Sequence, residues 1–231
     1  MQAQSQIPSY DRSFAARFGA LAFTANISVF LTQFIAQFGA QDYNPATDDI
    51  SLLGVTRCGA LTDPMTQATI IACSPLHTVF NAGLVFMGVS VLIGALLTRR
   101  NWPGKMGAAG VGLLSIAAAG TVLSGLAPIN EKVSLHLLGA MIYFPLIGIA
   151  IALLGLSVRK TEKMFSHFSL ACGVICFIGF FVYGNYLALD LPRGIMERVA
   201  AYPSTLWVVA CGVFLLARRR RVFETAAHSA G

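Results

Sequence analysis

Long apolar runs alternate with short polar segments along most of the chain. A helix needs about 20 apolar residues to cross the hydrocarbon layer of a bilayer, and six runs reach that length. The pattern predicts an all-α integral membrane protein, a six-helix bundle that forms one domain over residues 1–231. We expect its helices near residues 14–38, 76–97, 106–127, 133–156, 165–189 and 199–217.

The composition agrees with this reading and narrows the class of protein. Hydrophobic residues make up 56% of the chain and charged residues only 11%, whereas a soluble domain carries about 25% charged residues. Most of the surface must therefore face lipid. This excludes nucleic-acid readers, cytosolic enzymes and secreted disulfide scaffolds, and it makes membrane lipid the expected partner, with a protein partner or a second copy of the chain also open.

The distribution of Lys and Arg predicts the orientation, because basic residues of short loops stay in the cytoplasm. With the N-terminus inside, the cytoplasmic segments hold Arg12, Arg17 and the clusters at 99–105, 159–163 and 218–221. Only Arg57, Lys132, Arg193 and Arg198, four of the 16 basic residues, fall on the other side. We therefore expect both termini in the cytoplasm and the protein in the plasma (inner) membrane.

The segment from residue 39 to residue 75 is too long for a simple connection between helices, so we expect it to carry structure or function. It lies outside in the predicted topology, where disulfides persist. Cys58 and Cys73 are its two cysteines, and the sequence predicts a disulfide between them. The alternative is a pair of free thiols in a cytoplasmic loop, which requires the inverted topology.

Polar side chains gather near the outer ends of the predicted helices, where they are costly in lipid and mark functional sites or contacts between helices. This common depth predicts a polar pocket that opens outward beneath the long loop. The alternative for each residue is a structural role, as a helix cap or as an interhelical hydrogen bond. The candidate ligand-binding residues are Gln37, Asn81, Asn185, Glu197 and Arg198, with Gln33, His77, His136 and Tyr183 at the same level.

Several short strings resemble a known pattern. Residues 49–54 read Asp-Ile-Ser-Leu-Leu-Gly, and residues 74–83 read Ser-Pro-Leu-His-Thr-Val-Phe-Asn-Ala-Gly. Together with Ala127-Pro128, His136, residues 194–198 and the Tyr202-Pro203 pair, they resemble the bacterial and archaeal membrane family called domain of unknown function 998. The resemblance spans nearly the whole chain. The chain departs from the usual Ser-Asp-Leu-Gly form of the first motif, because Leu52 stands where an Asp is common.

A more distant similarity links the chain to the Frag1/DRAM/Sfk1 group of six-helix proteins. That group also has an Ile-Ser element in its first outer loop and a Pro…Phe…Gly element entering its second helix. The group is associated with lipid handling, so the resemblance implies a lipid-related role. It supplies no reaction and no cofactor.

Three functional classes fit these residues. The first is a lipid-binding or partner-binding protein without catalysis, in which the motifs hold the outer loop on the helix ends. The second is an outer-leaflet enzyme acting on a lipid, with His77 or His136 as general base, Asp49 or Glu131 as orienting carboxylate and Ser51 as nucleophile.

The third class is a redox or metal protein, with His77 and His136 as ligands of a haem or a divalent ion. No Cys-x-x-Cys-His or His-x-x-x-His string supports it, so we assign no metal ligands. An ion-coupled transporter fits less well, because no acidic residue is expected at the middle of the membrane.

Overall fold

The computed structural model describes residue 11 and residues 13–228, with side chains described as far as residue 218. Six helical segments in this part of the chain are long and apolar enough to cross a membrane, which confirms the predicted all-α architecture. The first span consists of α1 (Phe14–Thr24) with α2 (Ile27–Gly39), and the second of α3 (His77–Thr98) with the short helix η2 (Arg99–Asn101). The later spans are α4 (Gly104–Leu126), α5 (Val133–Ser157), α6 (Lys163–Gly184) and α7 (Arg193–His228).

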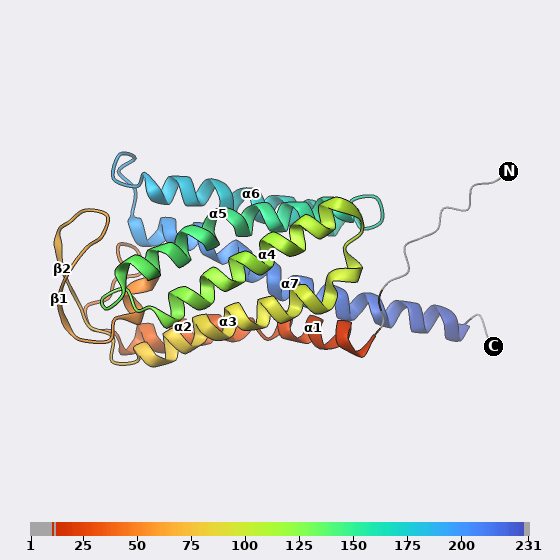
Figure 1. The fold of residues 1–231 in the computed structure, drawn as a ribbon, viewed down its shortest axis with the longest axis horizontal. Helices are drawn as coiled ribbons and strands as arrows, with labels where there is room; N and C mark the ends of the chain where they lie inside the picture. Colours follow the sequence, from red (N-terminus) through yellow and green to blue (C-terminus); the bar gives the residue numbers. More distant parts are fainter. Residues whose placement is uncertain (1–10, 12, 229–231) are drawn as a thin grey trace.

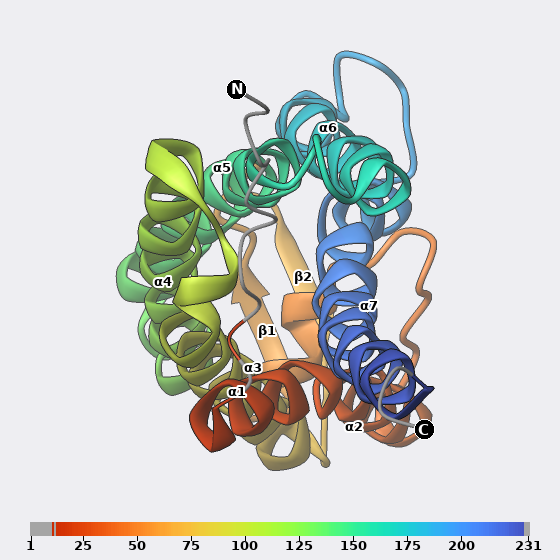
Figure 2. The ribbon, with the colours of Figure 1, turned by 90° about the vertical axis from the view of Figure 1, so that its right-hand side faces the viewer.

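The spans form a closed ring around a common centre (Figure 2). Each span packs against the next in chain order, and α7 closes the ring against α1. The segment between α2 and α3 covers one end of the ring, which we call the loop end (Figure 1). The start of α1 and the far end of α7 lie at the opposite end of the ring, which we call the terminal end (Figure 1).

Two predicted boundaries were wrong at the loop end. Helix α6 ends at Gly184 instead of residue 189, and α7 begins at Arg193 instead of residue 199. The prediction followed apolar residues only, and the first turns of α7 are charged. Glu197 and Arg198 therefore lie within a helix, not before it. At the other end α7 runs on to residue 228. Arg12 and the side chains of residues 219–221, which we counted among the basic residues that predict the orientation, lie outside the described part.

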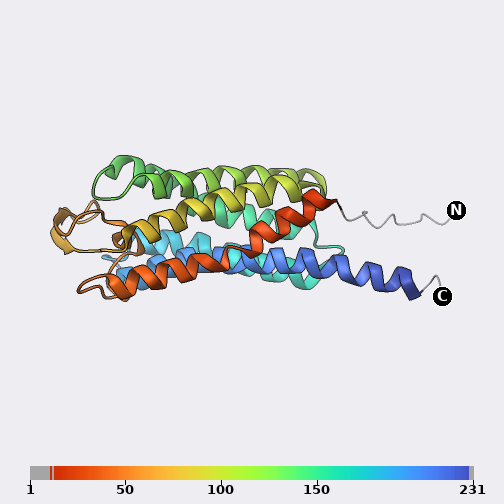
Figure 3. The same ribbon diagram turned by 90° about the horizontal axis from the view of Figure 1, so that it is seen from below.

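The first span is broken at Ala25 and Asn26 (Figure 3). The backbone N–H of Asn26 bonds the carbonyl of Phe23 instead of the regular carbonyl of Ala22. The Asn26 side chain makes up for this loss, because its Nδ2 donates to Ala22 O at 3.0 Å. An unpaired carbonyl is costly in lipid, so this fully buried asparagine explains how the carbonyl of Ala22 stays paired at the bend.

The segment between α2 and α3 carries the structure that its length predicts. It contains a short helix, η1 (Ile50–Gly54), and a hairpin of strands β1 (Gly59–Thr62) and β2 (Thr69–Ala72). The strands are antiparallel, with Gly59 opposite Ala72 and Thr62 opposite Thr69. The predicted disulfide between Cys58 and Cys73 is confirmed and closes the base of this hairpin.

Large aromatic side chains fill the terminal-end half of the ring. Phe165 stacks on Phe214 with ring centroids 4.1 Å apart, and Trp102 and Trp207 pack beside them. The Trp207 indole N–H donates to Ser169 Oγ at 2.8 Å, so even the polar atom of this fully buried ring is paired. The terminal-end half is thus solidly packed, and the space inside the ring lies at the loop end.

Candidate functional site

A cavity of about 450 Å³ lies in the loop-end half of the ring. Every span lines it with residues from the half that adjoins the segment between α2 and α3, and most of these side chains are apolar. The volume is within the range of about 300–1,000 Å³ that small-molecule pockets occupy. The polar and charged lining residues are Gln33, Asp49, Ser51, Thr121, Ser124, His136, Tyr143, Tyr183, Arg193, Glu197, Tyr202 and Thr205.

The segment between α2 and α3 forms the roof of this cavity. Ile50 and Ser51 of η1 line it, and so do Pro64 and Met65 from the turn of the hairpin. The buried side of η1 packs on the loop ends of two spans, because Leu53 forms an apolar cluster with Ala36 and Phe80. The roof is therefore built into the core of the bundle and is more than a surface loop.

Hydrogen bonds fix η1 at both of its ends. The buried carboxylate of Glu197 in α7 accepts the backbone N–H of Ile50. At the other end, Ser74 Oγ donates to Leu53 O at 2.7 Å, and Asn81 Nδ2 donates to Gly54 O at 2.9 Å. Side chains from motifs far apart in the sequence thus satisfy the backbone groups that a short helix leaves unpaired.

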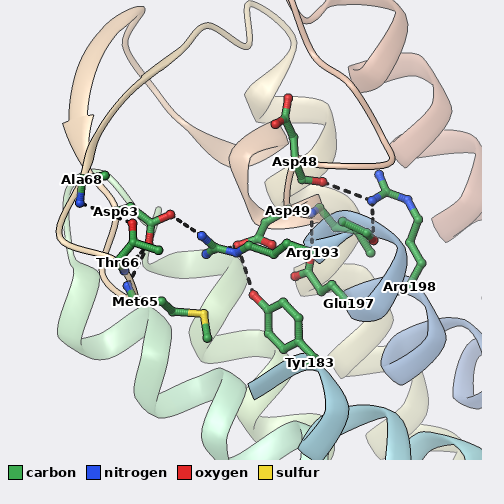
Figure 4. A network of polar contacts seen from close by, with 12 residues as sticks. Asp48, Asp49, Asp63, Met65, Thr66, Ala68, Tyr183, Arg193, Glu197 and Arg198 are labelled. Carbon is green, nitrogen blue, oxygen red and sulfur yellow. Dashed lines mark hydrogen bonds and ion pairs between the residues drawn. The ribbon is translucent and has the colours of Figure 1, made fainter. Parts of the chain in front are cut away.

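Arg193, at the start of α7, is the centre of an ion-pair network beneath the hairpin (Figure 4). Its two terminal nitrogens pair with Asp49 and with Asp63. The Tyr183 hydroxyl donates to Asp49 Oδ2 at 3.0 Å. Both carboxylates are buried, with 3% of each residue exposed, so the network joins the roof, the hairpin, α6 and α7 in a place with little water.

The two carboxyl groups of this network respond differently to burial. Burial raises the pKa of Asp49 above its ordinary value, and Arg193 only partly opposes this effect. Burial also acts on Asp63, but backbone N–H bonds from Met65 and Thr66, together with Arg193, outweigh it and hold the pKa of Asp63 below its ordinary value. Asp63 therefore stays charged and anchors the hairpin turn to α7, whereas Asp49 keeps one oxygen, Oδ1, buried without a hydrogen-bond partner.

A second hollow of about 370 Å³ lies beside the first, against the outer face of the roof. Asp49 and Arg193 line both hollows. Thr47, Asp63 and Thr66 contribute polar groups to the second hollow alone. The Asp49–Arg193 pair therefore forms part of the partition between the cavity inside the bundle and the hollow at its loop-end surface.

Arg198, one turn further along α7, holds the chain that leads into η1. Its guanidinium donates to the Asp48 carbonyl at 3.2 Å and to the Tyr43 hydroxyl at 2.6 Å. The helix approaches this chain closely because Gly194 has no side chain: a Cβ there would lie 2.5 Å from Asp48 O and 2.6 Å from Pro45 O. Gly194 and Arg198 thus bring the loop and α7 together.

His136, in the first turn of α5, lies at the wall of the cavity with 7% of the residue exposed. Its Nδ1 is 2.9 Å from Ala127 O and 3.2 Å from Ser124 O. Since carbonyl oxygens only accept, Nδ1 carries the hydrogen and the neutral ring keeps Nε2 as an acceptor. No side chain in the described residues bonds Nε2, and no carboxylate orients this ring.

The structure brings together some of the residues predicted from the sequence and separates others. Asp49, Ser51, His136 and Glu197 line one cavity. The remaining candidates are placed elsewhere. Asn81 bonds the carbonyl of Gly54, and Arg198 bonds that of Asp48, so both hold the roof. His77 Nδ1 lies 3.0 Å from Ser74 O, and Glu131 accepts from the Thr56 hydroxyl at 2.5 Å. Asn185 donates to Phe181 O, and Gln37 is half-buried outside the cavity.

Gln37, His77, Asn81 and Asn185, which we expected around the pocket, do not line this cavity. Their depth in the membrane was estimated from helix ends alone, and depth does not say which face of a helix points inward. Sequence reasoning also missed Arg193 and Asp63, which it counted only as charges for topology. The sequence did contain one indication of this ion pair: an arginine stands just before an apolar helix, and acidic residues lie in the long outer loop.

The arrangement resembles neither a metal site nor an assembled nucleophile and base. In the described part of the chain, no three His, Cys, Asp or Glu side chains come together to hold a metal ion. Ser51 and His136 line the same cavity, but no hydrogen bond between described residues joins them. What the geometry does present is an apolar cavity with charged groups along one edge.

Fold and site together define a multi-pass membrane protein with a roofed cavity inside its helical ring. The family model described as "Protein of unknown function (DUF998)" matches residues 21–214. The chain therefore belongs to this family, as its motifs predicted. No curated protein and no solved structure shows significant similarity to the chain. The more distant similarity to the Frag1/DRAM/Sfk1 group stays a prediction.

Proposed function

We propose that this protein binds a lipid-like amphiphile in the cavity, without catalysing a reaction on it. The observation that carries the proposal is the form of the cavity: an apolar chamber of about 450 Å³ inside the bundle, with Asp49, Arg193 and Glu197 at the edge beneath η1. An amphiphile places its tail among apolar side chains and its polar head beside polar groups. Ligand pockets of this kind are mostly apolar, with a few polar groups that fix orientation.

The use of the motif residues supports binding over catalysis. Ser74, Asn81 and Glu197 satisfy the backbone of η1, and Arg198 holds the preceding chain. These residues therefore build and position the roof. His136 binds backbone carbonyls through Nδ1, a geometry that fixes the ring without a catalytic partner.

The seam between α2 and α7 is the route by which we expect the ligand to enter from the surrounding lipid. Helix α1 packs along α7, whereas α2 touches α7 at few positions. The seam is closed by Gln33 Nε2, which donates to the Tyr202 hydroxyl at 2.5 Å, and by the edge of the Phe30 ring against Tyr202. All three side chains also line the cavity, so moving them would connect it with the bilayer.

We further propose that the protein lies in the plasma (inner) membrane with both termini in the cytoplasm. The distribution of basic residues supports this orientation. The disulfide supports it too, because Cys58–Cys73 lies at the loop end, which this topology places in an oxidising compartment. In that orientation the cavity lies at the depth of the outer leaflet.

Filling the cavity tests the proposal. Ala140 lines the cavity on α5, and the A140F variant places a ring where the ligand tail is expected. We expect lipid that co-purifies with the wild-type protein, measured by mass spectrometry after extraction, to fall severalfold in A140F. The matched control is A119F, which makes the same change at an exposed position of α4 and should leave the bound lipid unchanged.

Equal amounts of lipid on the wild-type protein, A140F and A119F would show that lipid only coats the outside of the bundle. That result would contradict binding in the cavity. A thermal-unfolding scan of each variant, made on the same preparations, confirms that the comparison is between folded proteins.

A further inference from the structure

We infer that the polar head of the ligand is a hydrogen-bond donor, a hydroxyl or ammonium group, and not a phosphate or a carboxylate. This inference rests on the proposed function, since it assumes that the cavity takes an amphiphile. It follows from which polar atoms of the cavity wall are already paired within the protein. Buried polar groups require partners, so the unpaired atoms describe the missing group.

The unpaired atoms at the wall are mainly acceptors. Asp49 Oδ1 is buried and has no hydrogen-bond partner. Glu197 uses Oε2 for the backbone of Ile50, and no described residue donates to its Oε1. His136 donates through Nδ1, which leaves Nε2 as an acceptor.

Most of the donors at the wall are already committed. Tyr183 donates its hydrogen to Asp49, and Gln33 Nε2 donates to Tyr202. Both terminal nitrogens of Arg193 pair with carboxylates, and only its Nε is unpaired. Tyr202 accepts from Gln33, and its hydroxyl, like those of Ser51 and Thr205 at the wall, has a second lone pair that can accept from a ligand.

The charges at the cavity wall also favour a head group without negative charge. The carboxyl groups of Asp49 and Asp63 both pair with the guanidinium of Arg193, so this cation is already shared between two acids. An added phosphate would bring further negative charge to a buried group of acids, where like charges repel strongly. A hydroxyl adds no charge, and an ammonium group compensates the acids.

The experiment compares probes that differ only in the head. Monooleoylglycerol, oleylamine and oleoyl-lysophosphatidic acid each carry one chain of the same length. With equal concentrations of the probes, native mass spectrometry of the delipidated protein measures the fraction bound. We expect at least one of the two donors to bind about tenfold more tightly than the phosphate, the difference that about 1.4 kcal/mol produces. The donor that binds more tightly identifies the hydroxyl or the ammonium head.

A second comparison tests the atoms named above. E197Q keeps an oxygen to accept the Ile50 N–H but replaces the second oxygen with an N–H₂ donor. We expect the ratio of donor binding to phosphate binding to fall severalfold in E197Q. The matched control is E131Q, the same change at an exposed residue outside the cavity, which should keep the wild-type ratio.

The outcomes separate this inference from the proposed function. If the phosphate binds as well as or better than both donors, a lipid-like ligand stands and the donor head is overturned. If none of the three probes binds, the proposed function itself is contradicted. The comparison of probes on the wild-type protein decides between these results even if E197Q does not fold.

Discussion

Replacing Arg193 with methionine is expected to destabilise the protein by about 3–5 kcal/mol, the usual cost of removing one partner from a buried ion pair. Arg193 pairs with Asp49 and Asp63, both of them buried. Without the guanidinium, two carboxylates remain in a place with little water and no cation beside them. Thermal unfolding in detergent and the yield of folded protein measure the loss.

The matched control for R193M is R218M at the terminal end of the same helix. Arg218 pairs with Glu162 at 2.7 Å, but the two side chains are 22% and 26% exposed. Solvent screens this pair, so its removal should cost only about 0–1 kcal/mol. If R193M were no less stable than R218M, the network beneath the hairpin would not hold the roof.

Arg193 also forms part of the partition between the cavity and the outer hollow. The methionine of R193M cannot bridge Asp49 to Asp63, and the hairpin turn loses its anchor on α7. We therefore expect faster hydrogen exchange at Met65 and Thr66 in R193M than in the wild-type protein. R218M should exchange at the wild-type rate in this turn.

Loss of the disulfide has the second largest expected effect. Cys58 and Cys73 are 15 residues apart, and the chain-entropy model assigns about 3 kcal/mol to a bridge that closes a loop of this length. The C58S/C73S variant should unfold at a lower temperature by a corresponding amount. The hairpin of β1 and β2 should open first, because the bridge closes its base.

Reductant supplies the control for this prediction. Added dithiothreitol should lower the unfolding temperature of the wild-type protein toward that of C58S/C73S and leave the variant itself unchanged. If the wild-type protein and the variant unfold alike without reductant, the two cysteines are not bridged in the cell. The topology that places the loop end in an oxidising compartment would then lose its support.

The spans were predictable because crossing a bilayer requires long apolar runs, and these runs are directly visible in the sequence. The features that were not predicted, the first turns of α7 and the break in the first span, depend on specific side-chain contacts. The charged first turns of α7 are stable because Glu197 and Arg198 find partners in residues 43–50. The break at Asn26 depends on a side chain that bonds the backbone of its own helix. Neither contact produces a repeating pattern of apolar residues, so neither can be recognised from the sequence.

The sequence indicated a polar pocket at the outer helix ends, but it did not indicate which residues line that pocket. Polar residues at one depth predicted an outward pocket, and His136 and Glu197 of that set line the cavity. The same reasoning placed Asn81 in the pocket, although its side chain turns toward the Gly54 carbonyl. Arg193 entered the prediction only as a positive charge, because its partners, Asp49 and Asp63, lie more than 100 residues away in the sequence.

Ligand binding in the cavity can be tested with a density map of the protein purified in mild detergent, at a resolution that shows bound lipid. If an amphiphile occupies the cavity, the map will contain elongated density inside the ring between α2, α5 and α7, with its polar end beside Asp49, Glu197 and His136. A map in which these side chains bond only to one another, and in which the cavity is collapsed, would contradict it. The protein would then be a bundle whose motifs serve only to hold its roof.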